Sequence, residues 1–142
     1  MTHTVGVFAS LFDTDGRIIL VRQAYAGRCW AQPGGRLEAG ESPIDGLLRE
    51  ILEETAVQAR VEGYVGTYAA PYRDDLVLHF RASVITKGRW VPSSEIIGCH
   101  AFEPDSLPEP MRPHTKARIT DGLQGRSNVF RTLLSPDEAI DL

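Results

Sequence analysis

Alternation of apolar and polar positions is clearest between residues 76 and 84, where it predicts a β-strand. One face would carry Leu76, Leu78, Phe80, Ala82 and Val84, and the other Val77, His79, Arg81 and Ser83. Further apolar runs predict strands at residues 5–11, 17–23, 57–68 and 96–102. The turn signal at residues 13–16 ends in Gly16, so the first two strands are expected to form a hairpin.

A helical period replaces this alternation over residues 42–55. Its apolar stripe, with the spacing i, i+3, i+4, i+7, consists of Ile44, Leu47, Leu48 and Ile51. Ser42 is expected to cap the helix, and Pro43 fits the first helical position, where a missing N–H costs nothing. Asp45 in the first turn suits the helix dipole.

The rest of the chain predicts connecting segments and a second helix. Residues 24–35 and the proline-rich residues 104–113 are expected to be loops, and residues 114–123 a helix that ends near Gly125. The last dozen residues are expected either to pack or to form a flexible tail. Strands that alternate with two helices predict one mixed α/β domain over residues 1–142.

The composition is typical of a globular domain and restricts the classes of binding partner that are expected. The chain is 42% hydrophobic and 24% charged, with a net charge of −4, which disfavours long nucleic acid. Cys29 and Cys99 lack zinc spacing and are interpreted as thiols in a reducing compartment. No secretory leader is recognised, and no segment approaches the roughly 20 apolar residues that span a bilayer. We therefore expect a cytoplasmic protein without a membrane partner.

Carboxylates gather in one sector of the helix predicted at residues 42–55. Glu50, Glu53 and Glu54 lie three and four residues apart, where like charges repel by roughly 0.2–0.5 kcal/mol per pair. Glu41 lies just before the helix. By composition alone, a solvated acidic face partly offset by Arg49 is the favoured interpretation. The alternative is a site for a hard cation, because oxygen ligands without cysteine suit Mg²⁺ or Mn²⁺.

The segment that precedes and includes the helix changes this balance. From Gly35 the chain reads Gly, five residues, Glu41, seven residues, Arg49-Glu50-Ile51, one residue, Glu53-Glu54, one residue, Ala56-Val57. This spacing resembles the signature box of the Nudix hydrolase superfamily, and the upstream Trp30 and Pro33-Gly34-Gly35 are similar to the family's approach to the box. Ala56 departs from it, because the family has glycine there. If that position needs a left-handed backbone, alanine costs about 1 kcal/mol and the metal site is expected to stay intact.

The resemblance implies a fold and a chemistry. The fold is a single-domain α/β/α sandwich with a mixed β-sheet and a catalytic loop-helix-loop. Glu50, Glu53 and Glu54 match the principal metal ligands, Glu41 a supporting ligand, and Arg49 a residue that orients a carboxylate. The implied reaction is attack of water on phosphorus in a nucleoside diphosphate linked to another group, with Mg²⁺ or Mn²⁺ as cofactor. Homodimers are common among such proteins, so a homodimer is an open expectation.

The resemblance leaves the general base and the substrate contacts open. The base is expected to be a glutamate of the box, or Glu95 or Glu103, either of which is equally well a surface residue. The candidate substrate-binding residues are Arg22, Gly34, Gly35 and Arg81. Two adjacent glycines allow a close approach of the backbone, and an arginine can bind phosphate bidentately. His79 is expected to be a hydrogen-bonded structural residue.

Three functions remain as hypotheses. Arg22-Gln23 and residues 95–108 resemble the branch that acts on sugar diphosphates, which favours ADP-ribose or a nucleotide sugar over a nucleoside triphosphate. The alternatives are a nucleoside triphosphate pyrophosphatase and a domain that senses nucleotides without cleaving them. The remaining interpretation of the same residues is a structural domain whose acidic helix only faces water.

Overall fold

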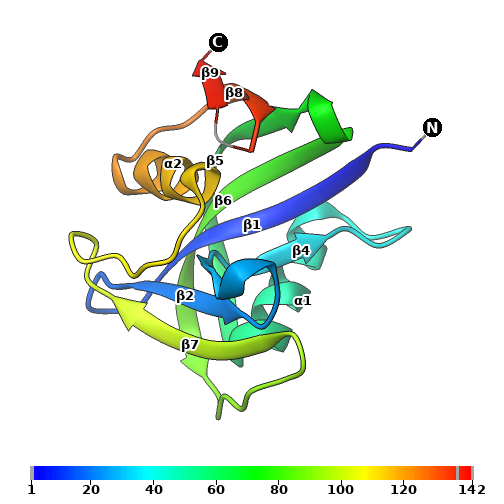
Figure 1. Ribbon diagram of the computed structural model, residues 1–142. Coiled ribbons are helices and arrows are strands. Elements are labelled where there is room, and N and C mark those ends of the chain that lie inside the picture. Colours follow the sequence, from blue (N-terminus) through cyan, green and yellow to red (C-terminus); the bar gives the residue numbers. More distant parts are fainter. Residues whose placement is uncertain (1, 137, 142) are drawn as a thin grey trace.

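The computed structural model describes residues 2–136 and 138–141, in which a mixed sheet has one helix packed on each face (Figure 1). The strands are β1 (Thr4–Phe12), β2 (Ile18–Gln23), β3 (Trp30–Ala31), β4 (Gly34–Arg36), β5 (Val57–Ala70), β6 (Asp75–Lys87), β7 (Ile96–Phe102), β8 (Val129–Ser135) and β9 (Glu138–Asp141). The helices are α1 (Pro43–Thr55) and α2 (Pro113–Leu123), with short 3-10 turns η1 (Ala26–Arg28) and η2 (Pro71–Arg73). This architecture confirms the predicted mixed α/β fold.

The sheet combines parallel and antiparallel pairs. Its order is β3-β2-β1-β6-β5-β8-β9, with β4 also paired to β1 and β7 to β2. The pairs β1–β6 and β5–β8 are parallel, and the others are antiparallel. The predicted hairpin is present, with Leu11 opposite Ile19. Its turn is closed by the Asp13 carboxylate, which accepts the backbone N–H groups of Asp15 and Arg17.

Two stretches are more ordered than the sequence indicates. The predicted loop at residues 24–35 contains η1, β3 and the start of β4, because strands of two and three residues are too short to show a period. Near the end of the chain, β8 pairs with β5 and β9 with β8, so these residues continue the sheet. Residues 137 and 142 lie outside the described part of the chain. Among the described residues, no helix is long and apolar enough to cross a membrane.

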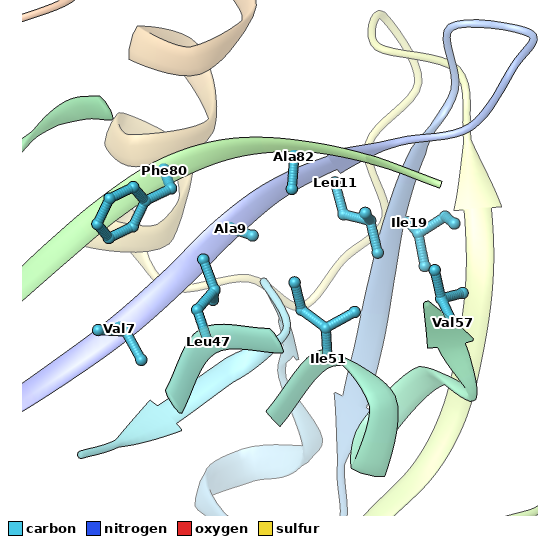
Figure 2. Close-up of a cluster of buried hydrophobic side chains, with 9 residues drawn as sticks. All are labelled: Val7, Ala9, Leu11, Ile19, Leu47, Ile51, Val57, Phe80 and Ala82. Carbon is cyan, nitrogen blue, oxygen red and sulfur yellow. The ribbon is translucent and has the colours of Figure 1, made fainter. Parts of the chain in front are cut away.

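The α1 face of the sheet is apolar, as the alternation predicts. Figure 2 shows its cluster, which consists of Val7, Ala9, Leu11, Ile19, Leu47, Ile51, Val57, Phe80 and Ala82. Leu47 and Ile51 of the predicted helical stripe are fully buried, whereas Ile44 in the first turn is 46% exposed. Burial of this stripe fixes the direction in which the opposite, acidic sector of α1 points.

Ala56, the residue that departs from the signature box, lies at the C-terminal end of α1. Ala56 has φ 60° and ψ 22°, a left-handed conformation, and its N–H donates to the carbonyl of Leu52. At the other end, Ser42 Oγ accepts the Asp45 N–H at 3.1 Å, which confirms the predicted cap. Alanine therefore stands where the backbone favours glycine.

Ala56→Gly is expected to raise the free energy of unfolding by about 0.5–1 kcal/mol, because glycine adopts this conformation without the Cβ clash. Urea denaturation measures the change. Ala59→Gly, within β5, is the matched control and is expected to destabilise the protein, since strand glycines lose packing and entropy. A loss of stability in Ala56→Gly would contradict this account of the helix end.

The α2 face carries a buried polar cluster. Ser10 Oγ lies 2.8 Å from His79 Nε2, and Gln32 Nε2 lies 3.0 Å from each of these two atoms. Burial, followed by the charge of Arg118, lowers the pKa of His79 to about 3, so the imidazole is neutral. His79 is thus hydrogen-bonded inside the fold, as expected.

Asp121 anchors the same face. It is fully buried and accepts two hydrogen bonds from Arg131 (2.9 and 2.7 Å), one from Arg126 (2.8 Å) and one from the Tyr68 hydroxyl (2.7 Å). Burial by itself raises the pKa of Asp121, but hydrogen bonds from Arg131, Tyr68 and Arg126 outweigh it and lower the pKa to about 2.

Asp121→Asn is expected to lower the free energy of unfolding at neutral pH by about 3–5 kcal/mol, because it removes the buried charge against which two arginines are held. Denaturant unfolding measures the loss. Since the pKa is depressed on folding, the stabilisation is full above the ordinary aspartate pKa and disappears as the pH falls toward 2. Glu109→Gln, which removes the exposed ion pair to Lys116, is the control and should change little. An equally small effect of Asp121→Asn would refute the anchoring role.

Candidate active site

The acidic sector of α1 faces a cavity of about 650 Å³. The charged residues that line it are Glu50, Glu54, Glu95, Asp75, Arg36 and Arg73. They come from α1, β4, the start of β6, η2 and the segment before β7. Residues widely separated in sequence therefore meet at one concave surface, which is the usual form of a small-molecule site.

Glu54 is the most strongly perturbed carboxyl group in the cavity. Its Oε1 accepts the Gly34 N–H at 3.0 Å. Burial raises the pKa of Glu54 to about 8, because the opposing effect of the Gly34 hydrogen bond is outweighed and the negative charge of Glu50 adds to the rise. Burial also raises the pKa of Glu50, against the lowering effect of Arg49. Two carboxyl groups with perturbed pKa values in one cleft are typical of a functional site.

The two glycines before the box bring β4 against these carboxylates. A Cβ on Gly35 would lie 2.7 Å from Glu50 Cδ, and a Cβ on Gly34, whose φ is 155°, would lie 2.1 Å from the carbonyl oxygen of Val7. A side chain is therefore excluded at Gly34, and one at Gly35 would displace the Glu50 carboxylate. The close backbone approach expected of Gly34 and Gly35 is thus made to α1 and β1, and it places both glycines in the cavity wall.

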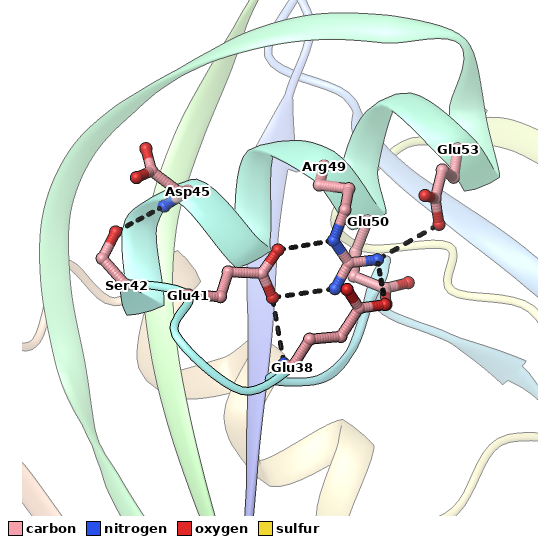
Figure 3. Close-up of polar contacts among 7 residues, drawn as sticks. All are labelled: Glu38, Glu41, Ser42, Asp45, Arg49, Glu50 and Glu53. Atoms are coloured by element: carbon pink, nitrogen blue, oxygen red, sulfur yellow. Dashed lines mark hydrogen bonds and ion pairs between the residues drawn. The ribbon is translucent and has the colours of Figure 1, made fainter.

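Arg49 gathers the other carboxylates of the box (Figure 3). Its guanidinium forms a bidentate pair with Glu41, with Nε–Oε2 2.6 Å and Nη2–Oε1 3.0 Å. Nη1 donates to Glu50 at 3.0 Å and to Glu53 at 3.3 Å. The Arg49 hydrogen bonds lower the pKa of Glu41 to about 2. One guanidinium therefore offsets the mutual repulsion of three carboxylates and orients them.

The donor chemistry of this cluster fits a hard divalent cation. All candidate ligand atoms are carboxylate oxygens, the donors that Mg²⁺ and Mn²⁺ prefer. Among the described residues, no group of three or more Asp, Glu, His or Cys side chains is already close enough to hold a metal ion. Arg49 engages Glu41, Glu50 and Glu53, whereas Glu54 is held separately by Gly34. Glu50, Glu53 and Glu54 come from α1 and Glu41 from the segment before it, and of these four Glu50 and Glu54 line the cavity.

Of the two glutamates considered as a general base outside the box, the structure brings one to the cavity. Glu95 lines it, and its backbone carbonyl accepts the Ala24 N–H at 2.8 Å. Glu103 follows the other end of β7 and pairs with Arg17 at 2.9 Å, away from the cavity lining.

The two arginines predicted to bind substrate also lie outside the cavity lining. Arg22 donates its Nε to the carbonyl of Arg28 at 3.0 Å and its guanidinium lies 5.8 Å from the Trp30 ring centroid. Arg81 alternates with Phe80 and so points to the α2 face, where it donates to the carbonyl oxygens of Gly122 and Arg126. Both side chains are therefore engaged in holding local structure.

Two other cationic residues line the cavity, Arg36 and Arg73. Arg36 lines the cavity directly after the Gly34-Gly35 step, so its closeness to the box was a usable signal. Arg73 lies in η2 between two long strands and has no sequence signal, because only the β5–β6 pairing brings it to the cavity.

A second cavity of about 400 Å³ adjoins the first. The two share Phe8, Gln23, Tyr25 and Arg73 among their lining residues, so they form successive parts of one cleft. The second part also includes Trp30, Tyr72, Arg112 and Arg118. A ligand that extends beyond the α1 carboxylates would enter this space.

Comparisons with known proteins agree with one another. The family model described as NUDIX domain matches residues 2–123. A MutT-like protein from Streptomyces ambofaciens is 34% identical over 123 residues, which cover 87% of this chain and 79% of that protein. A Bacillus subtilis (strain 168) protein, provisionally named an 8-oxo-dGTP diphosphatase, is 33% identical over 133 residues, which cover 92% of this chain and 87% of that protein.

Solved structures show the same fold. An ADP-ribose pyrophosphatase from Streptococcus suis 89-1591 matches with a TM-score of 0.74 and 22% identity, covering 92% of this chain and 98% of that one. A UDP-X diphosphatase matches with a TM-score of 0.75 and 26% identity, covering 92% of this chain and 67% of that one.

Proposed function

The chain belongs to the Nudix hydrolase family, and from that premise we propose that it is an Mg²⁺-dependent enzyme that cleaves nucleoside diphosphates linked to a second group. Nudix hydrolases generally need a divalent metal, and the relatives are named as pyrophosphatases or diphosphatases. The reaction class is hydrolysis of a phosphoanhydride.

One observation carries the proposal. The cavity places Glu50 and Glu54 on one wall and Arg36 and Arg73 among its other lining residues. Carboxylates suit a cation and arginines suit phosphate oxygens, so both parts of a metal-bound diphosphate find matching groups.

Each residue then has a defined task. Glu50, Glu53 and Glu54 would hold the cation, with Glu41 in support, and the cation would supply charge neutralisation and a more acidic water. Arg49 keeps Glu41 and Glu50 oriented through the contacts described above. A carboxylate that faces the cavity, Glu54 or Glu95, accepts the proton of the attacking water.

The length of the cleft favours a substrate with groups on both sides of the diphosphate. Two adjoining cavities of about 650 and 400 Å³ offer one space beside the carboxylates and another beyond them. ADP-ribose and nucleotide sugars have groups on both sides of the diphosphate, so we place these ahead of a nucleoside triphosphate. The Bacillus subtilis relative's name supports the triphosphate as the second candidate.

A substrate panel tests the proposal. The protein with Mg²⁺ is incubated with ADP-ribose, UDP-glucose, dGTP and 8-oxo-dGTP, and the released monophosphate and pyrophosphate are measured. We expect the highest kcat/KM for a diphosphate-linked compound and no turnover in EDTA. A preference for 8-oxo-dGTP would favour the second candidate. Tight calorimetric binding without turnover of any compound would refute hydrolysis and favour a nucleotide sensor.

A further inference from the structure

The second cavity has the opposite charge character to the first. We call it the basic pocket; its lining includes Arg73, Arg112 and Arg118 and the aromatic residues Phe8, Tyr25, Trp30 and Tyr72. Among the described residues, it is lined by no aspartate or glutamate. The first cavity is lined by four carboxylates, Glu50, Glu54, Asp75 and Glu95, and by two arginines, Arg36 and Arg73. One cleft therefore runs from a carboxylate end to a guanidinium end.

Arg118 is the buried arginine of the basic pocket. The residue is 8% exposed, and its guanidinium lies 5.1 Å from the Phe8 ring centroid. Its Nε donates to Gln32 Oε1 at 2.9 Å and its Nη2 lies 3.5 Å from Thr115 Oγ1. Within the described part of the chain, Nη1 carries no hydrogen bond and no carboxylate forms an ion pair with Arg118. Asp75 attracts Arg118 but forms its ion pair with Arg73, and a buried cation without a carboxylate in contact is costly unless an anion joins it.

The surroundings of Arg118 favour the same kind of ligand. Arg112 lies at the N-cap of α2 and donates to the carbonyl of Ala26 at 3.2 Å. The first turn of α2 contributes Thr115 to the lining, so the positive end of an 11-residue helix borders the pocket. Arg73 reaches the pocket from η2, where its Nη2 pairs with Asp75 at 3.0 Å. Three arginines from different elements thus converge on one space.

Aromatic rings complete the wall. Tyr25 is 55% exposed and Tyr72 is 43% exposed, and the Arg73 guanidinium lies 5.9 Å from the Tyr72 ring centroid. Trp30 lines the floor and is 9% exposed. Exposed rings beside arginines suit a flat ring system that carries a negative charge.

We propose that the basic pocket binds a phosphate monoester joined to a flat ring, so that, within the substrate class proposed above, compounds that also carry such a monoester bind more tightly than those that do not. The link to substrate rests on the proposed function, whereas binding of the monoester needs no turnover. A dianionic phosphate group offers several oxygens to the guanidinium forks of Arg112 and Arg118. The ring lies against the tyrosines.

Binding to the metal-free protein in EDTA tests this directly. Phenyl phosphate, phenol and inorganic phosphate are titrated separately, and the indole N–H signal of Trp30 is followed by NMR, with Trp90→Phe used for assignment. We expect saturable binding of phenyl phosphate and no measurable binding of phenol. Arg112→Gln should weaken phenyl phosphate binding about tenfold, the effect of one charged hydrogen bond. Lys116→Gln removes a positive charge from α2 outside the pocket lining and should change affinity less than about twofold.

The outcomes separate the alternatives. Equal binding of phenol and phenyl phosphate, or unchanged affinity in Arg112→Gln, would overturn the proposal. Inorganic phosphate that binds as tightly as phenyl phosphate would identify the pocket as a site for free phosphate and overturn the assignment to substrate. Arg118→Lys keeps the charge and loses the fork, so it is expected to weaken phenyl phosphate binding as well. Since no step depends on hydrolysis, failure here leaves the substrate panel unaffected, and an inactive panel leaves this binding result unaffected.

Discussion

Glu54→Gln is expected to reduce kcat by about 10²–10⁴-fold, the range for losing an acid-base group or a metal-bound carboxylate at the reacting centre. Glutamine keeps the shape of the side chain and can still accept the Gly34 N–H, so the cavity wall should remain in place. Steady-state kinetics with the best compound of the substrate panel measures the loss. Glu62→Gln, an exposed glutamate of β5 that accepts a hydrogen bond from Ser83, is the matched control.

The same substitution should raise the stability of the metal-free protein. Burial raises the pKa of Glu54 to about 8, so the charged form is disfavoured in the folded state. The resulting destabilisation is absent at about pH 4, grows as the pH rises from the ordinary glutamate pKa to about 8, and is full above that. In EDTA the Tm of Glu54→Gln should therefore exceed that of the parent protein at about pH 9 and equal it at about pH 4. Retained activity with an unchanged Tm would remove Glu54 from the mechanism.

Arg49→Gln is expected to lower kcat/KM about 10²-fold, because loss of the guanidinium releases three carboxylates whose geometry it sets, and small displacements at a reacting centre have effects of this size. Arg49→Lys should recover part of the activity, since an ammonium keeps the charge but cannot form the bidentate pair with Glu41. Arg60→Gln, on the exposed part of β5, is the control. If Arg49→Gln kept the parent kcat/KM, orientation of the carboxylates by Arg49 would be disproved.

Periodic segments of the sequence were predicted well. The predicted helix at residues 42–55 corresponds to α1 (Pro43–Thr55), and the alternating run at residues 76–84 lies within β6 (Asp75–Lys87). Both signals are long, because burial of one face repeats over several turns or pleats. The spacing of the signature box indicated the family, since fixed positions on a helix determine which carboxylates share a sector.

Residues outside periodic segments were harder to place. Arg81 was considered for substrate binding, but its guanidinium donates to the carbonyl oxygens of Gly122 and Arg126 at the end of α2, and no local pattern shows where α2 packs. Arg73, Arg112 and Arg118 come from η2, the α2 cap and the body of α2, and their meeting depends on the packing of α2 against the sheet. No local sequence pattern predicts that these residues converge, because their convergence depends on tertiary packing. The burial that raises the pKa of Glu54 depends on tertiary packing in the same way.

The central claim is that the α1 carboxylates bind the divalent cation. The most direct measurement is a titration of the protein with Mn²⁺, followed by paramagnetic broadening of backbone amide NMR signals. The account predicts that the signals of Gly34, Gly35 and residues 50–54 broaden first and that Glu54→Gln weakens this effect. Broadening that begins elsewhere, for example at the exposed Asp13–Asp15 turn, with the signals of α1 unaffected, would contradict it.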